Sequence, residues 1–415
     1  MKTNHGFVLL ILVIIMAMMP LACGDDDDDD NDDGTPVDDD TTDDDTADDD
    51  IDDDDDDTTP TSTTMSFATY NAGLAYGFVP LAEERLPELY EAVPELDVDA
   101  LCLQEVWYED DRDGMVDALA DVLPYIYKHN SIEDFADQPP ESEARCGDLD
   151  NLISCAETNC DVNEVEGLLD CVIDNCLLPL ILTGFDCIEC LASQIDQPFD
   201  DMVDYCTNPN PPPLSYTGSN GLILASNLEL TDTEMLQLDF FLTVRVALHA
   251  KVQTESGPVH LYCTHLTAAI SILPYNGDYP SYEAEQAAQI DALLDWVEDT
   301  SDGEPVVLMG DFNNGPGVGG DPDEFPANYA ALIAAGMTDP YVAQHPDLCT
   351  YCSENPLNDE DTNDTIIDHL FFGGFGTPDF AAERVFTEPI MLTVDDDEVE
   401  SRLSDHYGNR VTATW

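Results

Sequence analysis

Positive charge is scarce in this chain of 415 residues, which has 10 Lys and Arg against 91 Asp and Glu. The formal net charge of −81 repels nucleic acid, because proteins bind its phosphates mainly through Lys and Arg. The composition therefore disfavours a tight or processive nucleic-acid-binding protein, although cleavage of nucleic acid with help from divalent ions stays open. Surfaces this acidic also occur in salt-adapted proteins, where net charge supports solubility.

Long apolar runs are also rare, and the one at residues 7–19 is too short to span a membrane comfortably. Lys2 precedes this run, so residues 1–23 are predicted to be an export signal. The signal ends in Pro20-Leu21-Ala22-Cys23, which resembles a bacterial lipoprotein cleavage site with the Leu one place later than usual. We therefore expect lipidation of Cys23, with ordinary secretion as the alternative. Either route places the chain outside the cytoplasm, where disulfides form.

Residues 24–64 contain few apolar side chains and form a second unusual segment. Residues 25–57 carry 23 of the 91 acidic residues and no Lys or Arg. Self-repulsion and the lack of apolar side chains predict a disordered linker that holds a folded domain away from a membrane. Weak calcium binding is an alternative, but the sequence specifies no ligand geometry for it.

Prolines enclose residues 138–217, which interrupt the pattern of the rest of the chain. This segment contains eight cysteines, Cys146, Cys155, Cys160, Cys171, Cys176, Cys187, Cys190 and Cys206. Their even number in an exported chain predicts a helical insert stapled by disulfides of undetermined pairing. Zinc is the less favoured alternative, because Cys187 and Cys190 lack a second Cys or His pair at finger spacing. The insert is expected to border the active face and to influence substrate choice.

Three further cysteine predictions concern the rest of the chain. Cys349 and Cys352 are expected to form a local or neighbouring disulfide. Cys102 is interpreted as structural, and Cys263 as a buried thiol within its strand.

Hydrophobic periodicity predicts a mixed α/β domain over residues 65–415, apart from the insert. Predicted strands cover residues 66–71, 99–106, 125–129, 220–226, 240–252, 258–264, 305–309, 365–372 and 409–414. Predicted helices cover residues 81–92, 113–122, 281–298 and 327–335.

Polar side chains stand at or near the ends of these predicted strands, namely Asn71, Glu105, His265, Asp311, Asn313, Asp368, Asp405 and His406. If the strands lie in one or two packed sheets, these side chains can meet at one edge. Hard oxygen ligands suit a magnesium-type ion, and a His held by a carboxylate can take a proton from water. Amides and a second His can stabilise developing charge on phosphate oxygens. Structural histidines and turn-capping carboxylates are the alternative for each residue taken singly.

Six motifs in this order resemble the endonuclease/exonuclease/phosphatase superfamily. They are Asn71, Gln104-Glu105, Thr264-His265-Leu266, Gly310-Asp311-Phe312-Asn313, Ile367-Asp368-His369 and Ser404-Asp405-His406. The resemblance implies a four-layer α/β sandwich, in which two mixed sheets pack face to face with helices outside. It covers about residues 65–415, except the cysteine-rich insert.

The same resemblance implies a metal site. Glu105 would bind the divalent ion, which we expect to be Mg²⁺, with Mn²⁺ or Ca²⁺ as alternatives. Asn71 would lie beside Glu105, and Asp405 would lie in the outer shell of the metal.

The resemblance also implies catalytic roles. His406 would be the general base, oriented by Asp368, while Asp311 and Asn313 would position the water and the phosphate. His265 would act as an acid or as a donor to a phosphate oxygen. The reaction would be in-line attack of water on phosphorus, without a covalent intermediate.

The expected function is that of an exported phosphodiesterase, monomeric and held at a membrane by its lipid anchor. Its expected substrate is a phospholipid headgroup or another small phosphodiester. An extracellular endonuclease and a surface-anchored binding protein are the alternatives. No aromatic hairpin for membrane insertion is evident, and residues 270–275 are the best candidate for an apolar lip, with ordinary loop packing as the other interpretation.

Overall fold

The computed structural model describes residues 62–128, 144–162, 167–195, 197–209, 220–241, 243–270, 275–318, 324–359, 362–394 and 397–415. The predicted export signal with Cys23 lies outside these residues, as do residues 24–61 of the predicted linker and residues 271–274 of the predicted lip. Among the described residues, no helix combines the length and apolar character needed to cross a membrane.

The first sheet has six strands in the order β10-β13-β1-β2-β4-β3. β1 runs parallel to β2, and the other neighbours are antiparallel. The strands are β1 (Thr64–Asn71), β2 (Ala100–Gln104), β3 (Tyr125–Tyr127), β4 (Ile223–Ser226), β10 (Asp379–Val385) and β13 (Gly408–Thr414). Asn71 lies opposite Gln104, so the two parallel strands end at the same edge, next to Glu105.

The second sheet has five strands in the order β5-β6-β7-β8-β9. They are β5 (Thr231–Gln237), β6 (Val246–Thr254), β7 (Gly257–His265), β8 (Val306–Asp311) and β9 (Asp368–Gly373). Only β7 and β8 are parallel among these neighbours. The register places His265 opposite Asp311 and Asp311 opposite Asp368, so three predicted site residues share one row at the end of the sheet.

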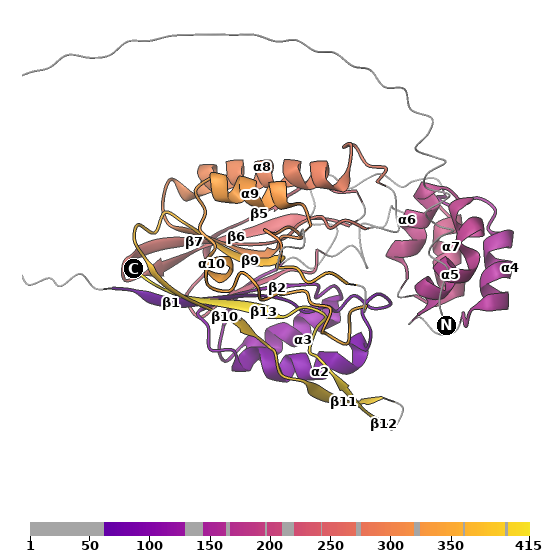
Figure 1. Ribbon diagram of the computed structural model, residues 1–415, viewed down its shortest axis with the longest axis horizontal. Coiled ribbons are helices and arrows are strands. Elements are labelled where there is room, and N and C mark those ends of the chain that lie inside the picture. The colour runs from indigo at the N-terminus through magenta and orange to yellow at the C-terminus, as the bar shows by residue number, and fades with distance from the viewer. Residues whose placement is uncertain are drawn as a thin grey trace, which may run out of the picture. The chain divides into compact units, whose positions relative to one another are not determined.

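The two sheets pack face to face around an apolar core, to which Phe67 of β1 and Leu261 of β7 both belong. Helices α2 (Ala82–Ala92) and α3 (Glu109–Leu119) cover the outer face of the first sheet. Helices α8 (Tyr282–Ser301) and α9 (Pro326–Ala334) cover the outer face of the second. Figure 1 shows these helix pairs on opposite sides of the sheets, which confirms the predicted four-layer sandwich.

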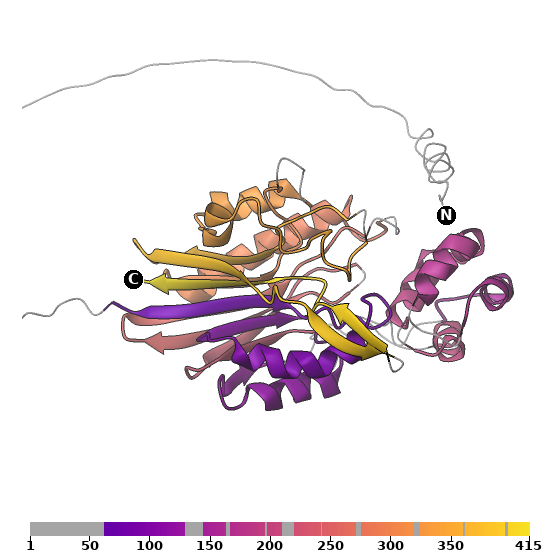
Figure 2. The same cartoon turned by 60° about the horizontal axis from the view of Figure 1, so that its bottom comes forward.

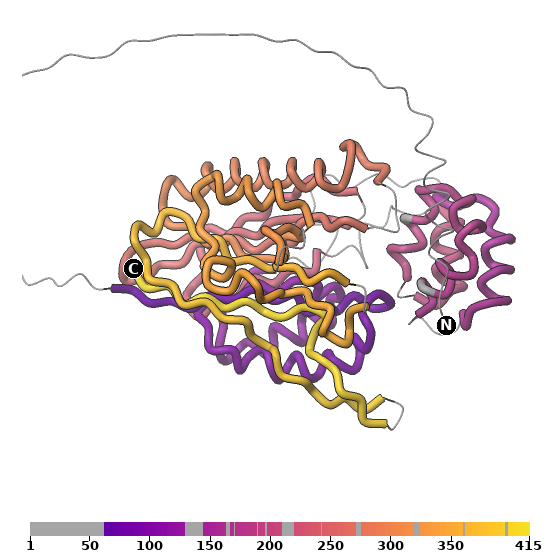
Figure 3. The backbone as a smooth tube through the Cα atoms, viewed as in Figure 1, coloured from indigo at the N-terminus to yellow at the C-terminus, as the bar shows by residue number. Residues whose placement is uncertain are grey.

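The described residues between 146 and 207 form four helices, α4 (Asp150–Asn159), α5 (Leu168–Ile181), α6 (Phe185–Ser193) and α7 (Phe199–Thr207). All eight cysteines there form disulfides, which pair Cys146–Cys187, Cys155–Cys176, Cys160–Cys171 and Cys190–Cys206. Figure 3 traces this helical segment in magenta. The prediction of disulfides rather than zinc is confirmed. The small apolar core of these helices also includes Ala75 and Trp107 from loops of the sandwich.

A further disulfide corrects the prediction for Cys263. Cys263 of β7 is bonded to Cys102 of β2, so this disulfide joins the two sheets across the core. The prediction of a free buried thiol is wrong, because the 161 residues between the two cysteines leave no local pattern to reveal the pair. The predicted disulfide between Cys349 and Cys352 is confirmed.

Some elements differ from the predictions. β6 begins at Val246, because the preceding residues form the connection from β5 and close on it through a Leu238 N to Arg245 O hydrogen bond. The edge strand β10 and the hairpin of β11 (Ile390–Val394) and β12 (Asp397–Ser401) were not predicted. β12 is largely exposed, whereas β10 and β11 bury alternate positions only in part, so their apolar pattern is weaker than that of a core strand. Figure 2 shows the hairpin extending beyond the sheets. The short helices η2 (Val93–Glu95) and α10 (Pro340–Gln344) were also not predicted.

Candidate active site

Asp311 lies at the centre of the predicted site. Asn71 Nδ2, at the end of β1, donates to Asp311 Oδ2 over 2.9 Å and so connects the two sheets. The nearest ring nitrogens of His265 and His406 are 3.5 Å and 3.9 Å from the same oxygen. Burial and the neighbouring Asp368 carboxylate raise the pKa of Asp311 to about 7. The predicted gathering of strand ends at one edge is therefore what the structure contains.

The close packing of β7 and β8 explains the glycine before Asp311. A Cβ atom at Gly310 would lie 2.2 Å from the Thr264 carbonyl oxygen, closer than real atoms approach. After Asp311, the backbone of Asn313 takes a left-handed conformation with φ 49°, and its N–H donates to Asp311 Oδ1 over 2.9 Å. Asn313 Nδ2 donates to Leu266 O over 3.1 Å. Asn313 therefore ties the loop after β8 to the end of β7.

His406 and Asp368 form an oriented pair. The imidazole Nδ1 donates to Asp368 Oδ2 over 2.9 Å, because an ionised carboxylate can only accept. This bond fixes the ring and directs Nε2 toward Asp311 and toward Asn71 Nδ2, which lies 3.5 Å away. Burial alone would lower the pKa of His406, but the carboxylates of Asp368, Asp405 and Asp311 raise it well above its ordinary value.

Glu105 and Asp405 bring two more carboxylates to the same edge. Glu105 has a left-handed backbone with φ 58°, uncommon for a residue with a side chain and typical of functional sites. Its Oε1 accepts from Asn71 Nδ2 over 3.2 Å. Burial and the nearby Asp405 carboxylate raise the pKa of Glu105. Glycine at position 73 leaves room for the Asp405 carboxylate, because a Cβ atom there would lie 2.2 Å from Asp405 Oδ1.

His265 has a different electrostatic setting from His406. Burial, followed by the positive charges of Arg245 and His406, lowers the pKa of His265 well below its ordinary value. Its ring centroid is 6.3 Å from that of Trp107. His265 is therefore neutral near pH 7, so it can donate a hydrogen bond but carries no charge.

The donor set fits a hard divalent cation. One oxygen each from Asp311 and Asp368 and one ring nitrogen of His406 lie within 4.8 Å of one another, a group that could hold a metal ion. Among the described residues, none bonds to the buried Asp368 Oδ1. Glu105 and Asp405 add two carboxylates that raise each other's energy in the absence of a cation. Two sets of residues could thus hold a metal ion, namely Asp311 with Asp368 and His406, and the predicted set of Asn71, Glu105 and Asp405.

Sequence reasoning missed the loop that holds the His406–Asp368 pair. Thr350 Oγ1 accepts from the backbone N–H groups of Ile367 and Asp368 over 3.1 and 3.2 Å. Thr350 O accepts from Tyr407 N over 2.7 Å. The ring of Tyr351 lies 4.9 Å from that of His406, centroid to centroid. The only sequence signal was the cysteine at either side of this dipeptide.

Two buried arginines were also missed. Arg85 of α2 donates through Nη1 to the carbonyls of Ala72 and Leu403, which joins the loop after Asn71 to the loop before His406. Arg245, just before β6, interacts electrostatically with Glu105 and Asp311. Among the described residues, neither Nε nor Nη1 of Arg245 has a hydrogen-bond partner. The scarcity of Arg and Lys in the sequence was the available signal for both residues.

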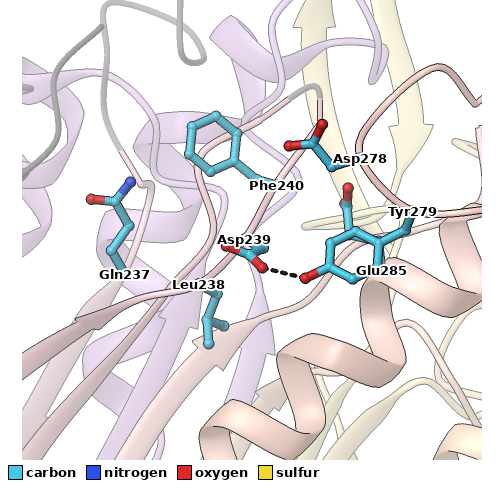
Figure 4. Close-up of a pocket in the computed structure, with 7 residues that line it drawn as sticks. All are labelled: Gln237, Leu238, Asp239, Phe240, Asp278, Tyr279 and Glu285. Atoms are coloured by element: carbon cyan, nitrogen blue, oxygen red, sulfur yellow. Dashed lines mark hydrogen bonds between the residues drawn. The ribbon is translucent and has the colours of Figure 1, made fainter.

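A pocket of about 240 Å³ lies apart from the predicted site residues. It is lined by Gln237, Leu238, Asp239, Phe240, Asp278, Tyr279 and Glu285, and the Tyr279 hydroxyl donates to Asp239 (Figure 4). The buried Glu285 carboxylate is already satisfied by the hydroxyls of Thr267 and Tyr275. Nothing in this pocket duplicates the cluster around Asp311.

The sequence of the chain matches a known protein family. The sequence model of the endonuclease/exonuclease/phosphatase family matches residues 68–406. The chain belongs to this family. Its members are metal-dependent phosphodiesterases. Among curated proteins, none matches the chain.

Solved structures share the fold at low sequence identity. SmcL is 13% identical with a TM-score of 0.52, and the match covers 85% of this chain and 99% of SmcL. Beta toxin from Staphylococcus aureus, solved as a double mutant with bound magnesium ions, is 13% identical with a TM-score of 0.50 over 84% of this chain and 99% of the toxin. Sphingomyelinase C from Streptomyces griseocarneus is 18% identical with a TM-score of 0.49 over 85% of this chain and 99% of that enzyme. The likeness to SmcL and beta toxin, at these identities, establishes the fold alone.

Proposed function

We propose that this protein is an exported, divalent-metal-dependent hydrolase that cleaves a phospholipid headgroup ester or another small phosphodiester. The observation that carries the proposal is the oriented His406–Asp368 pair, whose Nε2 points into a cluster of buried carboxylates and amides. Buried carboxylates that repel one another need a cation, and a cation beside a general base is the arrangement that hydrolyses phosphate esters.

His406 would take the proton from the attacking water at Nε2 once a bound cation offsets the carboxylates of Asp368, Asp405 and Asp311, which otherwise raise the pKa of His406 and keep its ring protonated. Asp368 holds the Nδ1–H, which keeps the ring in the tautomer that leaves Nε2 free to accept. Asp311 and the loop of Asn313 align the water with phosphorus, since the carboxylate faces Nε2 at 3.9 Å. Holding the reacting groups in this geometry supplies much of the rate enhancement.

Glu105 would hold the divalent ion, with Asn71 and Asp405 beside it. When bound, the ion would neutralise charge on the phosphate oxygens and the surrounding carboxylates. Beta toxin, which shares the fold and binds magnesium, supports Mg²⁺ as the ion. The six disulfides of the described residues are typical of proteins outside the cytoplasm, which supports export.

Donors on the opposite side of the cluster would bind the non-bridging phosphate oxygens. His265 is neutral and would donate without adding charge, whereas Arg245 supplies a buried positive charge with two nitrogens, Nε and Nη1, that have no partner among the described residues. Two such donor residues suit the oxygens of a single phosphate rather than those of a long polyanion. Outside residues 25–57 the chain has 68 acidic residues against nine Lys and Arg after Lys2, so a nucleic acid would be repelled over most of the surface. The lipid anchor expected at Cys23 would keep a monomeric enzyme near a membrane.

The test compares the exported protein with its His406→Ala variant, each in magnesium and in chelator. Both are offered sphingomyelin vesicles and plasmid DNA in parallel. We expect phosphocholine release that requires both the metal and His406. Plasmid nicking with the same dependence would instead establish an extracellular nuclease. No hydrolysis of either substrate, or of a synthetic phosphodiester, would overturn the proposal and favour a binding protein that reuses the fold.

A further inference from the structure

The end of α5 and the start of α6 present apolar side chains to solvent. The exposed fractions are 68% for Leu178, 53% for Ile181, 76% for Leu182 and 41% for Phe185. We call these four residues the apolar tip. They make up four of the ten large hydrophobic residues that are exposed among the described residues, and they lie within eight positions of one another. Concentration of exposed apolar side chains at one place is typical of an interaction surface.

Charge is absent from the tip but present at its margins. Residues 175–185 include no Asp, Glu, Lys or Arg, although 24% of the whole chain is charged. Asp174 and Asp186 stand exposed at the two ends of this stretch. A partner that covers the tip must therefore accept apolar side chains at the centre and carboxylates around them.

Disulfides hold the tip in place. Cys176 and Cys187 flank it in sequence and are bonded to Cys155 and Cys146, which belong to the other end of the helical insert. These bonds fix the chain on both sides of the tip. The core of the insert continues to Trp107, which follows Glu105 by two residues and faces His265. Packed side chains thus connect the tip to Trp107, at the edge of the candidate active site.

We propose that the apolar tip docks the enzyme on a bilayer of zwitterionic phospholipid, a step that rests on the proposed cleavage of phospholipid headgroups. Transfer of leucine, isoleucine and phenylalanine side chains from water to the boundary between headgroups and acyl chains lowers the free energy. The outermost groups of choline and ethanolamine lipids are ammonium ions, which complement Asp174 and Asp186. Anionic lipids would meet these carboxylates, and the acidic chain as a whole, with repulsion.

The experiment measures vesicle binding without turnover. The exported protein carries His406→Ala to prevent hydrolysis and Cys23→Ser so that no acyl chain contributes, and chelator is present. Co-sedimentation with phosphatidylcholine vesicles is compared with the same protein bearing Leu178→Glu and Leu182→Glu. We expect the double substitution to weaken partitioning at least about tenfold, because two exposed leucines no longer enter the bilayer. The matched control, Asn151→Glu with Ser154→Glu, adds the same charge to exposed positions of α4 and should leave partitioning unchanged.

A gain-of-binding variant guards against simple misfolding. Leu182→Trp places an aromatic ring that favours the membrane interface at the most exposed position of the tip. We expect tighter partitioning to phosphatidylcholine vesicles, a blue shift of the added tryptophan emission, and quenching of that emission by brominated lipid. Phosphatidylserine vesicles should bind every version more weakly than phosphatidylcholine vesicles.

Three outcomes would overturn the docking proposal. They are unchanged partitioning of the double glutamate variant, preference for phosphatidylserine, and a dimer in solution that the glutamates dissociate while vesicle binding persists. The dimer would assign the tip to a second copy of the chain. Since binding is measured on inactive protein, its loss is independent of substrate identity. Conversely, tip-dependent binding by a protein that hydrolyses no phosphodiester would sink the proposed function and leave the docking surface standing.

Discussion

The two sheets bury their apolar side chains against one another over a broad face, whereas the four helices of residues 146–206 share a small core and four disulfides. The sandwich has one disulfide across its core, between Cys102 and Cys263. All eight predicted site residues belong to the sandwich and its loops, and the exposed apolar tip belongs to the insert. The predicted site residues are therefore positioned by a core that is held together mainly by apolar packing. A stapled insert can change its surface without disturbing that core.

The largest expected effect concerns the buried carboxylate of Asp311, at the edge of the sandwich. Asp311→Asn keeps the shape of the side chain but removes a carboxylate whose pKa is raised by burial and by Asp368. Hydrolysis should fall on the order of a thousandfold, while the temperature of thermal unfolding in chelator should change little, because removal of a buried charge opposes the loss of one of the hydrogen bonds from Asn71 and Asn313. Steady-state kinetics and calorimetry of the two proteins measure both quantities. Full activity in the variant would remove Asp311 from the mechanism.

The next effect concerns the disulfide that joins the sheets. Cys102→Ala with Cys263→Ala removes a crosslink that closes 161 residues, and should lower the free energy of unfolding by roughly 4 kcal/mol. Because the bond crosses the shared core, spectroscopic probes of the whole sandwich should shift together in a denaturant titration. A shift confined to one sheet would contradict the view of the sandwich as one cooperative unit.

The corresponding change in the insert should stay local. Cys155→Ala with Cys176→Ala opens a bridge that spans 21 residues of sequence, and should cost the insert about 3 kcal/mol. Hydrogen exchange followed by mass spectrometry should show faster exchange in α4 and α5, with the protection of β1 and β7 unchanged. Loss of protection in those strands would show that the insert is part of the cooperative core.

The smallest effect concerns the loop that supports the His406–Asp368 pair. Thr350→Val removes the oxygen that accepts from the N–H groups of Ile367 and Asp368, and two buried donors are left unsatisfied. We expect about a tenfold loss of kcat with little change in KM, equivalent to roughly 1–2 kcal/mol of misplaced general base. Thr350→Ser keeps the oxygen and should restore most of the rate. A loss confined to KM would mean that the loop contacts substrate rather than His406.

The sequence was most informative where strands end. Four of the six motifs placed polar residues at the end of an apolar strand, and the other two stand at the start of β9 and just before β13. The register of β7, β8 and β9 then aligned His265, Asp311 and Asp368. Period-two alternation also located most strands of the core. The hairpin of β11 and β12 was not predicted because each strand buries only one residue, Leu392 in β11 and Ser401 in β12, and β11 is apolar at an exposed position as well.

Contacts between residues far apart in the sequence were the features that the sequence did not predict. Nothing local marks Cys102 and Cys263 as partners, because their contact follows only once two sheets pack. Thr350 acts through a hydroxyl that accepts backbone hydrogen bonds, a role that residue type alone does not reveal. Arg85 and Arg245 could have been singled out by the scarcity of positive charge, but their placement beside Ala72 and Glu105 required the fold.

The account depends most on where the divalent ion binds and on whether His406 is left free to accept a proton. Crystals soaked in Mn²⁺ and measured at its absorption edge locate the ion directly by anomalous scattering. The account predicts one strong peak at Glu105, next to Asn71 and Asp405, with His406 Nε2 uncoordinated. A peak bonded to His406 together with Asp311 and Asp368 would contradict it, since a metal-bound imidazole nitrogen cannot take the proton from water.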